Sequence, residues 1–215
     1  MNKIDCVIFD MDGVIVDTEP LHKKAYFKTF ESLGLDVSEE LYHSLTGSST
    51  INAFEKLISH FDLNENPNDL VLKKRSTFVG FFENDPSLSL IEGVEEIISY
   101  FYTKNITLVL ASSASMETIN RVFTRFNLDQ YFIGKLSGAD LEKSKPHPEI
   151  FIKAAQLAET PKNNCIVIED SDNGVLAANR AEIYCVGYKS EHSKLQTLKT
   201  ADMVITDFNK LKQYI

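Results

Sequence analysis

The hydrophobic positions of the chain form two kinds of pattern, short unbroken apolar runs and longer segments with helical spacing. Three such runs, of which the second is interrupted by Thr107, end in polar residues: residues 6–9 before Asp10, 106–111 before Ser112, and 165–168 before Glu169. Unbroken runs of this length are typical of strands that are buried on both faces. Further strands are expected at 132–136, 183–186 and 203–205.

Helical segments separate these runs from residue 94 onward. We expect helices at about 94–104 and 116–126, one that begins near Pro148, one after residues 171–174, and a closing helix at 207–214. Strands that alternate with helices indicate a parallel sheet with crossover helices. The predicted fold class is therefore α/β, with a doubly wound parallel sheet.

Residues 20–85 have a different pattern, since they contain several helical segments and no run typical of a strand. The expected helices span 21–33, 38–45, 50–61 and 68–82, and Phe78, Phe81 and Phe82 are expected in the core that these helices share. A linker that contains Pro86 and Gly93 leads back to the alternating part. We therefore expect a compact helical bundle inserted after the first strand.

Composition and charge exclude several classes of function. The 215 residues are 43% hydrophobic and 25% charged, with a formal net charge of -9. Sequence-independent binding to nucleic acid needs a cationic surface, so we expect no nucleic-acid partner. No apolar run is long enough to cross a bilayer and residues 1–5 lack the features of a signal peptide, so we expect no membrane association. Three cysteines in apolar runs, without metal-ligand spacing, favour reduced thiols in a cytoplasmic protein.

Polar side chains follow three of the predicted strands: Asp10 and Asp12, Ser112 and Ser113, and Glu169 and Asp170. In an open α/β sheet, ligands bind at the carboxyl ends of the strands. Carboxylates crowded there would raise one another's pKa unless a cation lies among them. Because the set contains no His or Cys, it suits Mg²⁺ better than zinc. We predict a Mg²⁺ site formed by Asp10, Asp12, Glu169 and Asp170.

The same groups indicate a route for phosphoryl transfer. Asp10 is the predicted nucleophile, because an aspartate carboxylate can form a covalent intermediate. Asp12 would offer its main-chain carbonyl to the metal, while its side chain protonates the leaving oxygen and later accepts a proton from water. Lys145, Ser112 and the amide of Ser113 would stabilise the phosphoryl oxygens.

Each of these pieces, taken alone, has a simpler interpretation. Ser112 and Ser113 would be an ordinary helix-capping pair, Lys145 a surface lysine, and residues 169–170 the start of a solvated turn. Each piece, however, follows a separate buried strand or lies on the loop after one, and together they meet the needs of one mechanism. This placement favours the catalytic interpretation.

The set Asp10-x-Asp12-Gly13, Ser112, Lys145-Pro146 and Glu169-Asp170 resembles, in order and spacing, the four motifs of the haloacid dehalogenase superfamily. The resemblance covers essentially the whole chain. It implies a Rossmann-like core of residues 1–16 and 88–215, a helical cap of residues 17–87, and Mg²⁺-dependent phosphotransfer through an aspartyl phosphate. The dehalogenases of the superfamily lack the second carboxylate of the first motif and need no metal. Asp12 and Asp170 therefore favour phosphate chemistry.

Within the superfamily, the chain is similar to β-phosphoglucomutase-like proteins and sugar-phosphate phosphatases through residues 17–20, 45–47 and 170–174 and through His22. The resemblance implies substrate contacts at Ser113, His22, Gly47, Thr50 and Asn173. The mutases hold a second phosphate with an arginine shortly after the cap glycine, and Thr50 stands at that position here. A hydroxyl cannot replace a bidentate guanidinium on a phosphate, which argues against mutase activity.

Other cationic residues of the predicted cap have open roles. Residues 73–75, Lys-Lys-Arg, would compensate for the missing arginine only if they face the cleft, and a solvated charge cluster on a helix face is the favoured interpretation. His22 is expected either to face the cleft beside Asp12 or to be an ordinary, partly exposed helix residue.

The leading hypothesis is a cytoplasmic, monomeric, Mg²⁺-dependent phosphatase that acts on a small phosphorylated metabolite, with a sugar phosphate as the expected substrate. A second enzyme hypothesis is a phosphomutase. From another class, the same carboxylates and lysine would suit a signalling receiver that stores phosphate on Asp10. The inserted cap and Asp12 argue against a receiver, because a stored phosphate needs no group that activates water.

Overall fold

Six parallel strands form the centre of the molecule in the computed structural model, which describes residues 3–190, 193 and 196–214. The strand order is β3-β2-β1-β4-β5-β6, and every neighbouring pair is parallel. The strands are β1 Cys6–Phe9, β2 Thr107–Ser112, β3 Gly134–Ser137, β4 Cys165–Glu169, β5 Tyr184–Tyr188 and β6 Met203–Ile205. The predicted α/β class and parallel sheet are confirmed, and the first strand lies in the middle of the sheet.

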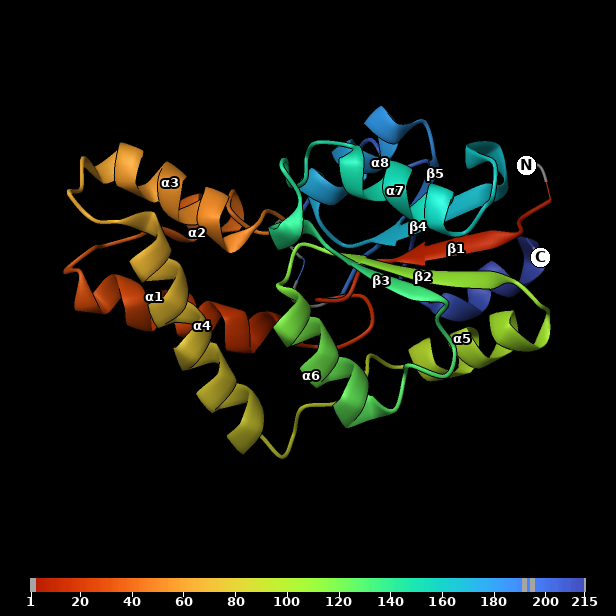
Figure 1. The fold of residues 1–215 in the computed structure, drawn as a ribbon, viewed down its shortest axis with the longest axis horizontal. Coiled ribbons are helices and arrows are strands. Elements are labelled where there is room, and N and C mark those ends of the chain that lie inside the picture. Colours follow the sequence, from red (N-terminus) through yellow and green to blue (C-terminus); the bar gives the residue numbers. More distant parts are fainter. Residues whose placement is uncertain (1–2, 191–192, 194–195, 215) are drawn as a thin grey trace.

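Helices cover both faces of the sheet, as a doubly wound fold requires (Figure 1). One face carries α5 (Val94–Thr103), α6 (Met116–Phe126) and a final 3₁₀ segment (Phe208–Tyr214), and the other carries α7 (Glu149–Leu157) and α8 (Asp172–Ala181). Alternate residues of β1 serve the two cores, since Val7 and Phe9 pack in one apolar cluster while Cys6 and Ile8 pack in the other. Burial on both sides explains the unbroken apolar run of this strand.

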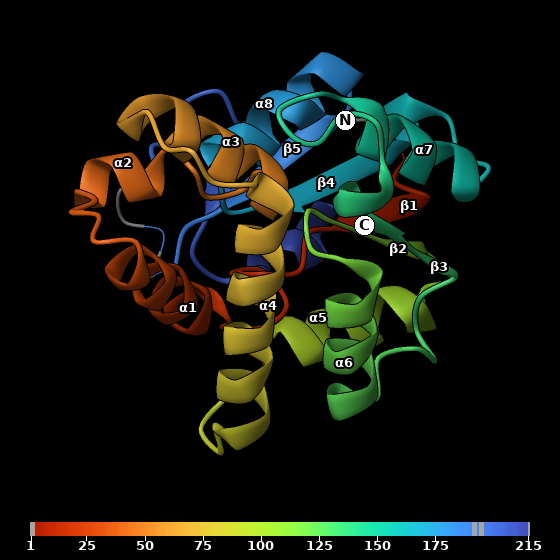
Figure 2. The same cartoon turned by 60° about the vertical axis from the view of Figure 1, so that its left-hand side comes forward.

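Four helices between β1 and α5 form a cap beyond the carboxyl ends of the strands (Figures 1 and 2). They are α1 Glu19–Ser32, α2 Glu39–His43, α3 Thr50–Phe61 and α4 Pro67–Asn84. An apolar cluster that includes Tyr26, Phe30, Tyr42, Phe54 and Leu70 holds these helices together. The predicted helical bundle is confirmed, whereas the domain boundaries at residues 16–17 and 87–88 stay a prediction.

The aromatic residues of α4 lie elsewhere than the helical pattern predicts. Phe78 and Phe82 are buried in the apolar cluster of the sheet, together with Val14 and Leu21, and Phe81 packs against the same cluster. The assignment of these three residues to the core of the bundle is therefore wrong. The physical reason is that the second half of this 18-residue helix packs back toward the sheet, so that one helix contributes to two cores.

Serine side chains mark the starts of four helices. Ser38, Ser49, Ser115 and Ser171 precede α2, α3, α6 and α8, and each accepts a hydrogen bond from a backbone N–H of the first turn. Two predicted helices differ in detail. The helix expected at 38–45 is confined to α2, and the closing helix expected at 207–214 is a 3₁₀ segment. Two short 3₁₀ turns, Gly138–Asp140 and Lys162–Asn164, precede α7 and β4.

Two arginines of α6 fix the end of α4. Arg125 donates hydrogen bonds to the carbonyl oxygens of Phe82 at 2.6 Å and Asp85 at 2.7 Å. Arg121 forms an ion pair with Glu83 at 2.6 Å. These contacts anchor one end of the cap to the helices that cover the sheet.

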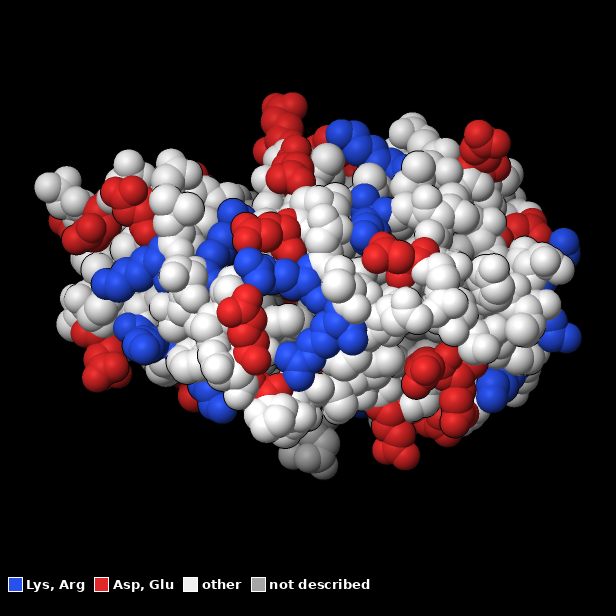
Figure 3. All heavy atoms as spheres, turned by 60° about the horizontal axis from the view of Figure 1, so that its bottom comes forward, with Lys and Arg blue, Asp and Glu red and all other residues white. Residues whose placement is uncertain are grey.

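The surface carries both signs of charge. On the face shown in Figure 3, lysine and arginine side chains are interspersed with aspartate and glutamate. The three cysteines are free and buried. Within the described residues, no helix combines the length and the apolar character needed to span a membrane.

Candidate active site

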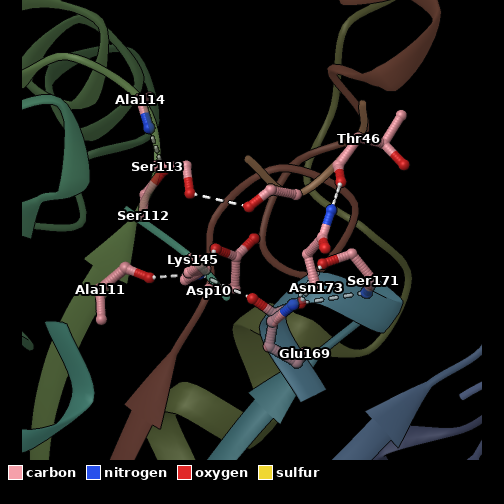
Figure 4. Close-up of polar contacts among 12 residues, drawn as sticks. Asp10, Thr46, Ala111, Ser112, Ser113, Ala114, Lys145, Glu169, Ser171 and Asn173 are labelled. Atoms are coloured by element: carbon pink, nitrogen blue, oxygen red, sulfur yellow. Dashed lines mark hydrogen bonds and ion pairs between the residues drawn. The ribbon is translucent and has the colours of Figure 1, made fainter. Parts of the chain in front are cut away.

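Polar side chains from three neighbouring strands meet at the carboxyl edge of the sheet (Figure 4). Asp10 directly follows β1, Ser112 ends β2 on one side of it, and Glu169 ends β4 on the other. The strand register causes this meeting, because Phe9 pairs with Leu110 in β2 and with Ile168 in β4. The predicted convergence of the three strand ends is therefore confirmed.

Lys145 lies among these groups, although it comes from the loop before α7. Its Nζ lies 2.5 Å from Asp10 Oδ1, 2.6 Å from Glu169 Oε1 and 2.9 Å from the carbonyl oxygen of Ala111. Burial by itself would lower the pKa of Lys145, but the two carboxylates outweigh it and raise the pKa, so the side chain is an ammonium. With 1% of its side chain exposed, this residue is not the surface lysine of the simpler interpretation.

The carboxylate of Asp10 is held in an environment that opposes its charge. Burial raises the pKa of Asp10, the ammonium of Lys145 lowers it, and the carboxylates of Glu169 and Asp12 raise it further. The balance leaves the pKa well above its usual value. A further cation at this edge would favour the ionised form that a nucleophile requires.

The charged groups that shift the pKa of Asp170 are all carboxylates. Burial and then the carboxylates of Glu19, Glu169 and Asp10 raise its pKa, and within the described part of the chain its side chain forms neither a hydrogen bond nor an ion pair. Asp10, Glu169 and Asp170 each offer an oxygen within 4.8 Å of the other two. The main chain of Gly13 borders this space closely, because a Cβ there would lie 2.1 Å from Asp170 Oδ2. A cradle of three carboxylates that share the one cation of Lys145 and offer only oxygen ligands fits a hard divalent cation such as Mg²⁺.

Glu169 differs from Asp10 and Asp170 because both of its oxygens have donors within the protein. Lys145 contacts Oε1, while the backbone N–H and the hydroxyl of Ser171 donate to Oε2 at 3.0 and 2.9 Å. Glu169 is thus the residue that orients the lysine and the start of α8. Its predicted role as a metal ligand stays a prediction.

Asp12 is held by side chains from the start of the cap. The hydroxyl of Thr18 donates to its Oδ1, and Nε2 of His22 lies 3.0 Å from the same oxygen. Nδ1 of His22 lies 2.7 Å from Nζ of Lys74. An ammonium can only donate, so Nδ1 is the acceptor and Nε2 carries the proton that points to Asp12. Burial favours the neutral acid, but His22 and Thr18 outweigh it and lower the pKa of Asp12.

His22 and Lys74 are fixed by aromatic rings as well as by each other. The imidazole of His22 stacks on Phe78 with a centroid distance of 4.1 Å, and Nζ of Lys74 lies 4.4 Å from the ring centroid of Tyr26. Burial lowers the pKa of Lys74 to about 8. Lys74 is thus a buried residue that reaches Asp12 through His22, and the favoured interpretation of a solvated cluster is wrong at this position.

A pocket lies between these groups and the cap. Core residues that line it include Asp10, Asp12, Asp170 and Ser113, and the cap supplies one lysine, two histidines and a carboxylate together with several hydroxyl and aromatic groups: Lys74, His22, His43, Glu19, Tyr26, Tyr42, Thr46, Ser48 and Thr50. Of the described lining residues, Lys74 is the one lysine or arginine. Burial, with help from the charge of Asp12, raises the pKa of Glu19 to about 7.

The residues predicted to bind substrate have different positions. His22, Thr50, Gly47 and Ser113 line the pocket. The hydroxyl of Ser113 donates to the Gly47 carbonyl at 2.9 Å. Asn173 is not among the described lining residues, and its amide donates to the carbonyl of Thr46 at 2.8 Å (Figure 4). Both contacts join the core to the cap.

Ser112 is buried at the end of β2, and its hydroxyl oxygen accepts a hydrogen bond from the backbone N–H of Ala114 at 3.0 Å. This contact fixes the turn that places Ser113 and Ala114 against the pocket. The predicted role of Ser112 as a donor to a phosphoryl oxygen, like the predicted substrate contacts, stays a prediction.

Comparison with known proteins identifies this arrangement. A sequence profile of the haloacid dehalogenase-like hydrolases matches residues 7–188, which is most of the chain. The chain belongs to this hydrolase family. The family, the parallel α/β fold and the helical cap expected from the resemblance are therefore confirmed, whereas the roles of the motif residues stay predictions.

Several known haloacid dehalogenase-like proteins are similar to this chain. A phosphorylated carbohydrates phosphatase from Thermotoga maritima is 29% identical over 184 residues, which cover 84% of this chain and 82% of that protein. Hexitol phosphatase B from Escherichia coli is 28% identical over 181 residues, with the same coverage of both chains. The crystal structure of a β-phosphoglucomutase from Clostridium difficile has a TM-score of 0.85 and 27% identity, and covers 98% of this chain and 97% of that chain.

Several pocket residues of this hydrolase were not predicted as site residues from its sequence, among them Glu19 and Lys74. Glu19 precedes His22 by three positions and therefore shares its face of α1, a spacing that could have placed both in the pocket. Lys74 lies four residues before Phe78 and four after Leu70, so it falls on the buried stripe of α4. In both cases helical periodicity gave the signal, and the charge of the side chain argued against using it.

Proposed function

We propose that this haloacid dehalogenase-like hydrolase is a Mg²⁺-dependent phosphatase that hydrolyses a small sugar phosphate through an aspartyl phosphate on Asp10. The observation that carries the proposal is the pairing of two carboxylates with separate surroundings. Asp10 is held by Lys145 at the strand ends, and Asp12 is held by His22 at the entrance to the cap. In this proposal Asp10 attacks phosphorus and Asp12 moves protons.

In the first half-reaction, an oxygen of Asp10 attacks phosphorus and the bond to the leaving oxygen breaks, while Asp12 gives that oxygen a proton. The phosphate dianion beside Asp12 favours the protonated form that this step requires. In the second half-reaction, Asp12 accepts a proton from water, whose oxygen attacks phosphorus and releases Asp10 and inorganic phosphate. The lowered pKa of Asp12 in the free protein suits this base step.

Lys145 contributes the charge that the transferred group needs. Its ammonium is fixed between Asp10 and Glu169, so that it can contact a phosphoryl oxygen near Asp10 without reorganisation. Mg²⁺ held by Asp10, Asp170 and the carbonyl of Asp12 would neutralise the remaining negative charge of the phosphoryl group. The uncompensated carboxylate of Asp170 supports this assignment.

The pocket favours a polyhydroxylated leaving group with one phosphate. Hydroxyls of Thr46, Ser48 and Thr50 and the carboxyl group of Glu19 line it, and such groups pair with sugar hydroxyls. Lys74 is 3% exposed and contacts His22, and an ammonium cannot hold a second phosphate in the bidentate manner of an arginine. The names of the similar phosphatases from Thermotoga maritima and Escherichia coli agree with this class of substrate.

The test is a screen of sugar phosphates and polyol phosphates with Mg²⁺, by release of inorganic phosphate, on the wild type, on Asp10→Asn, and on the exposed Asp140→Asn as a matched control. We expect turnover by the wild type and Asp140→Asn and none by Asp10→Asn. Turnover by Asp10→Asn would contradict the proposed nucleophile. Conversion of a sugar 1-phosphate to its 6-phosphate without phosphate release would favour a mutase, and a phosphoenzyme that lasts minutes without turnover would favour a receiver.

A further inference from the structure

Gln196 occupies a position between the core and the cap that no part of the proposed mechanism uses. It lies on the segment after β5, lines the pocket and is 7% exposed. Its Nε2 lies 2.5 Å from Oγ1 of Thr46 and 3.2 Å from the carbonyl oxygen of His43, both in the cap. Its Oε1 accepts a hydrogen bond from the backbone N–H of Asp172, in the core, at 2.8 Å.

The orientation of this amide follows from its neighbours. A flipped amide would set Oε1 against the His43 carbonyl and Nε2 against the N–H of Asp172, which places acceptor against acceptor and donor against donor. In the observed orientation both amide hydrogens and one lone pair have partners. The side chain is therefore a directed link between the first residue of α8 and the cap.

The segment that carries Gln196 is itself fixed to the core. The carboxylate of Asp172 accepts hydrogen bonds from the backbone N–H groups of Thr197 at 3.0 Å and Leu198 at 2.7 Å. Leu198 is 1% exposed in the apolar cluster under α8 and has a φ of 51°. Gln196 thus reaches the cap from a rigid base, and that is the condition for a side chain to position another element.

The cap element that it contacts faces the pocket. Residues 44–49, here called the cap loop, connect α2 to α3, and Leu45, Thr46, Gly47 and Ser48 line the pocket. Two further bonds hold this loop to the core, from Asn173 to the Thr46 carbonyl and from Ser113 to the Gly47 carbonyl. Gln196 is the contact that reaches both the end of α2 and the Thr46 side chain.

We infer that Gln196 is a positioning residue, which sets the cap loop at the distance from the core where it can contact the part of the substrate beyond the phosphoryl group. The inference rests on the proposed function, because it assumes a leaving group that touches the cap loop. Gln196 affects substrate affinity through the loop and not through Asp10 or Asp12, since it contacts neither.

The test compares Gln196→Met and Gln196→Glu with Thr197→Val. Methionine keeps the length of the side chain but removes its hydrogen-bonding groups. Glutamate keeps the acceptor for Asp172 and sets a second acceptor against the His43 carbonyl. Valine removes the hydroxyl of Thr197 from the same segment, and the described hydrogen bonds of this hydroxyl both go to the Asp172 carboxylate. The kinetic readouts are KM and kcat for the sugar phosphate found by the screen, and for acetyl phosphate, whose small leaving group does not reach the cap loop.

Both Gln196 variants lose the two hydrogen bonds that the amide donates to the cap, to Thr46 and to the His43 carbonyl. This loss predicts a KM for the sugar phosphate that is higher by about tenfold, with kcat changed less than about threefold. Acetyl phosphate hydrolysis and the Thr197→Val variant should match the wild type within about twofold. An equal loss on both substrates, or no loss on the sugar phosphate, would overturn the inference.

Hydrogen exchange separates this inference from the proposed function, because it needs no substrate. The backbone amides of the cap loop should exchange about tenfold faster in Gln196→Met than in the wild type and Thr197→Val. Unchanged exchange would overturn the positioning role even if the variant loses activity. Faster exchange in a protein that hydrolyses acetyl phosphate but no sugar phosphate would keep the positioning role and contradict the proposed substrate.

Discussion

Glu19 makes the stability of this protein depend on pH in a direction opposite to that of most acidic residues. Its pKa is raised from the model-compound value of 4.5 to about 7, first by burial and then by the charge of Asp12. The folded protein therefore holds this proton more tightly than the unfolded chain does. Stability from this group is present in full below pH 4.5 and is lost as the pH rises through 7.

The magnitude follows from the two pKa values. A shift of about 2.5 pKa units at 1.36 kcal/mol each corresponds to about 3.4 kcal/mol over the whole titration of Glu19. Because part of this loss lies below pH 5, the wild type should lose about 2.5 kcal/mol of unfolding free energy through Glu19 between pH 5 and pH 8. Glu19→Gln removes the titrating group, so its unfolding free energy should not show this loss. The difference between the two proteins should thus grow by about 2.5 kcal/mol over this range.

The assay is urea unfolding at several values between pH 5 and pH 8, in EDTA, so that no metal binds the neighbouring carboxylates. Glu142→Gln, an exposed glutamate that does not line the pocket, removes the same formal charge as a control and should stay parallel to the wild type. Curves for Glu19→Gln and the wild type that stay parallel within about 0.5 kcal/mol would refute the reasoning. They would mean that Glu19 ionises freely in the folded protein.

Three further predictions concern the site and its cap. Lys145→Met leaves the carboxylates of Asp10 and Glu169 without their buried cation. Urea unfolding should therefore show a loss of about 3–5 kcal/mol of unfolding free energy, together with loss of phosphatase activity. An active variant of unchanged stability would contradict the role of this lysine. Mg²⁺ at 100 times its Kd should stabilise the wild type by about 2.7 kcal/mol in thermal or chemical unfolding, and Asp170→Asn should abolish most of this gain. Gly47→Ala should lose about 1–2 kcal/mol of stability, because an alanine is strained at a φ of 76°. It should also raise KM, because its Cβ would lie 2.2 Å from Ser171 Oγ and displace the cap loop. The control Gly34→Ala has a φ of 67° and no atom within 4 Å, so it should lose stability without a change in KM.

The catalytic edge could be predicted from the sequence because its geometry depends on few quantities. Parallel strands that begin at one level end at one level, so Asp10 and Glu169 had to lie close together once the runs before them were recognised as neighbouring strands. Lys145 was predicted to lie at this edge because it comes from a loop between these strands and matches one of the superfamily motifs. The superfamily motifs then gave each residue an expected role.

The lining of the pocket could not be predicted in the same way. Which side chains of α1 and α4 face the pocket depends on how these helices cross, and the sequence does not specify the crossing. Lys74 was therefore taken for a surface residue, although it lies buried against Tyr26, and Phe78 was assigned to the bundle although it stacks on His22. The contact of Gln196 with the cap joins residues 150 positions apart and had no local signal.

The two carboxylates of the first motif are governed by different parts of the molecule. Strand ends and Lys145 determine the state of Asp10, whereas Asp12 takes its partners from α1 and, through His22, from α4. Under the proposed mechanism, substitutions within the cap would therefore change proton delivery by Asp12 to a new alcohol, while the proposed nucleophile Asp10 keeps its surroundings. In a fold divided in this manner, the groups around Asp12 in the cap can vary while the groups around Asp10 at the strand ends stay the same.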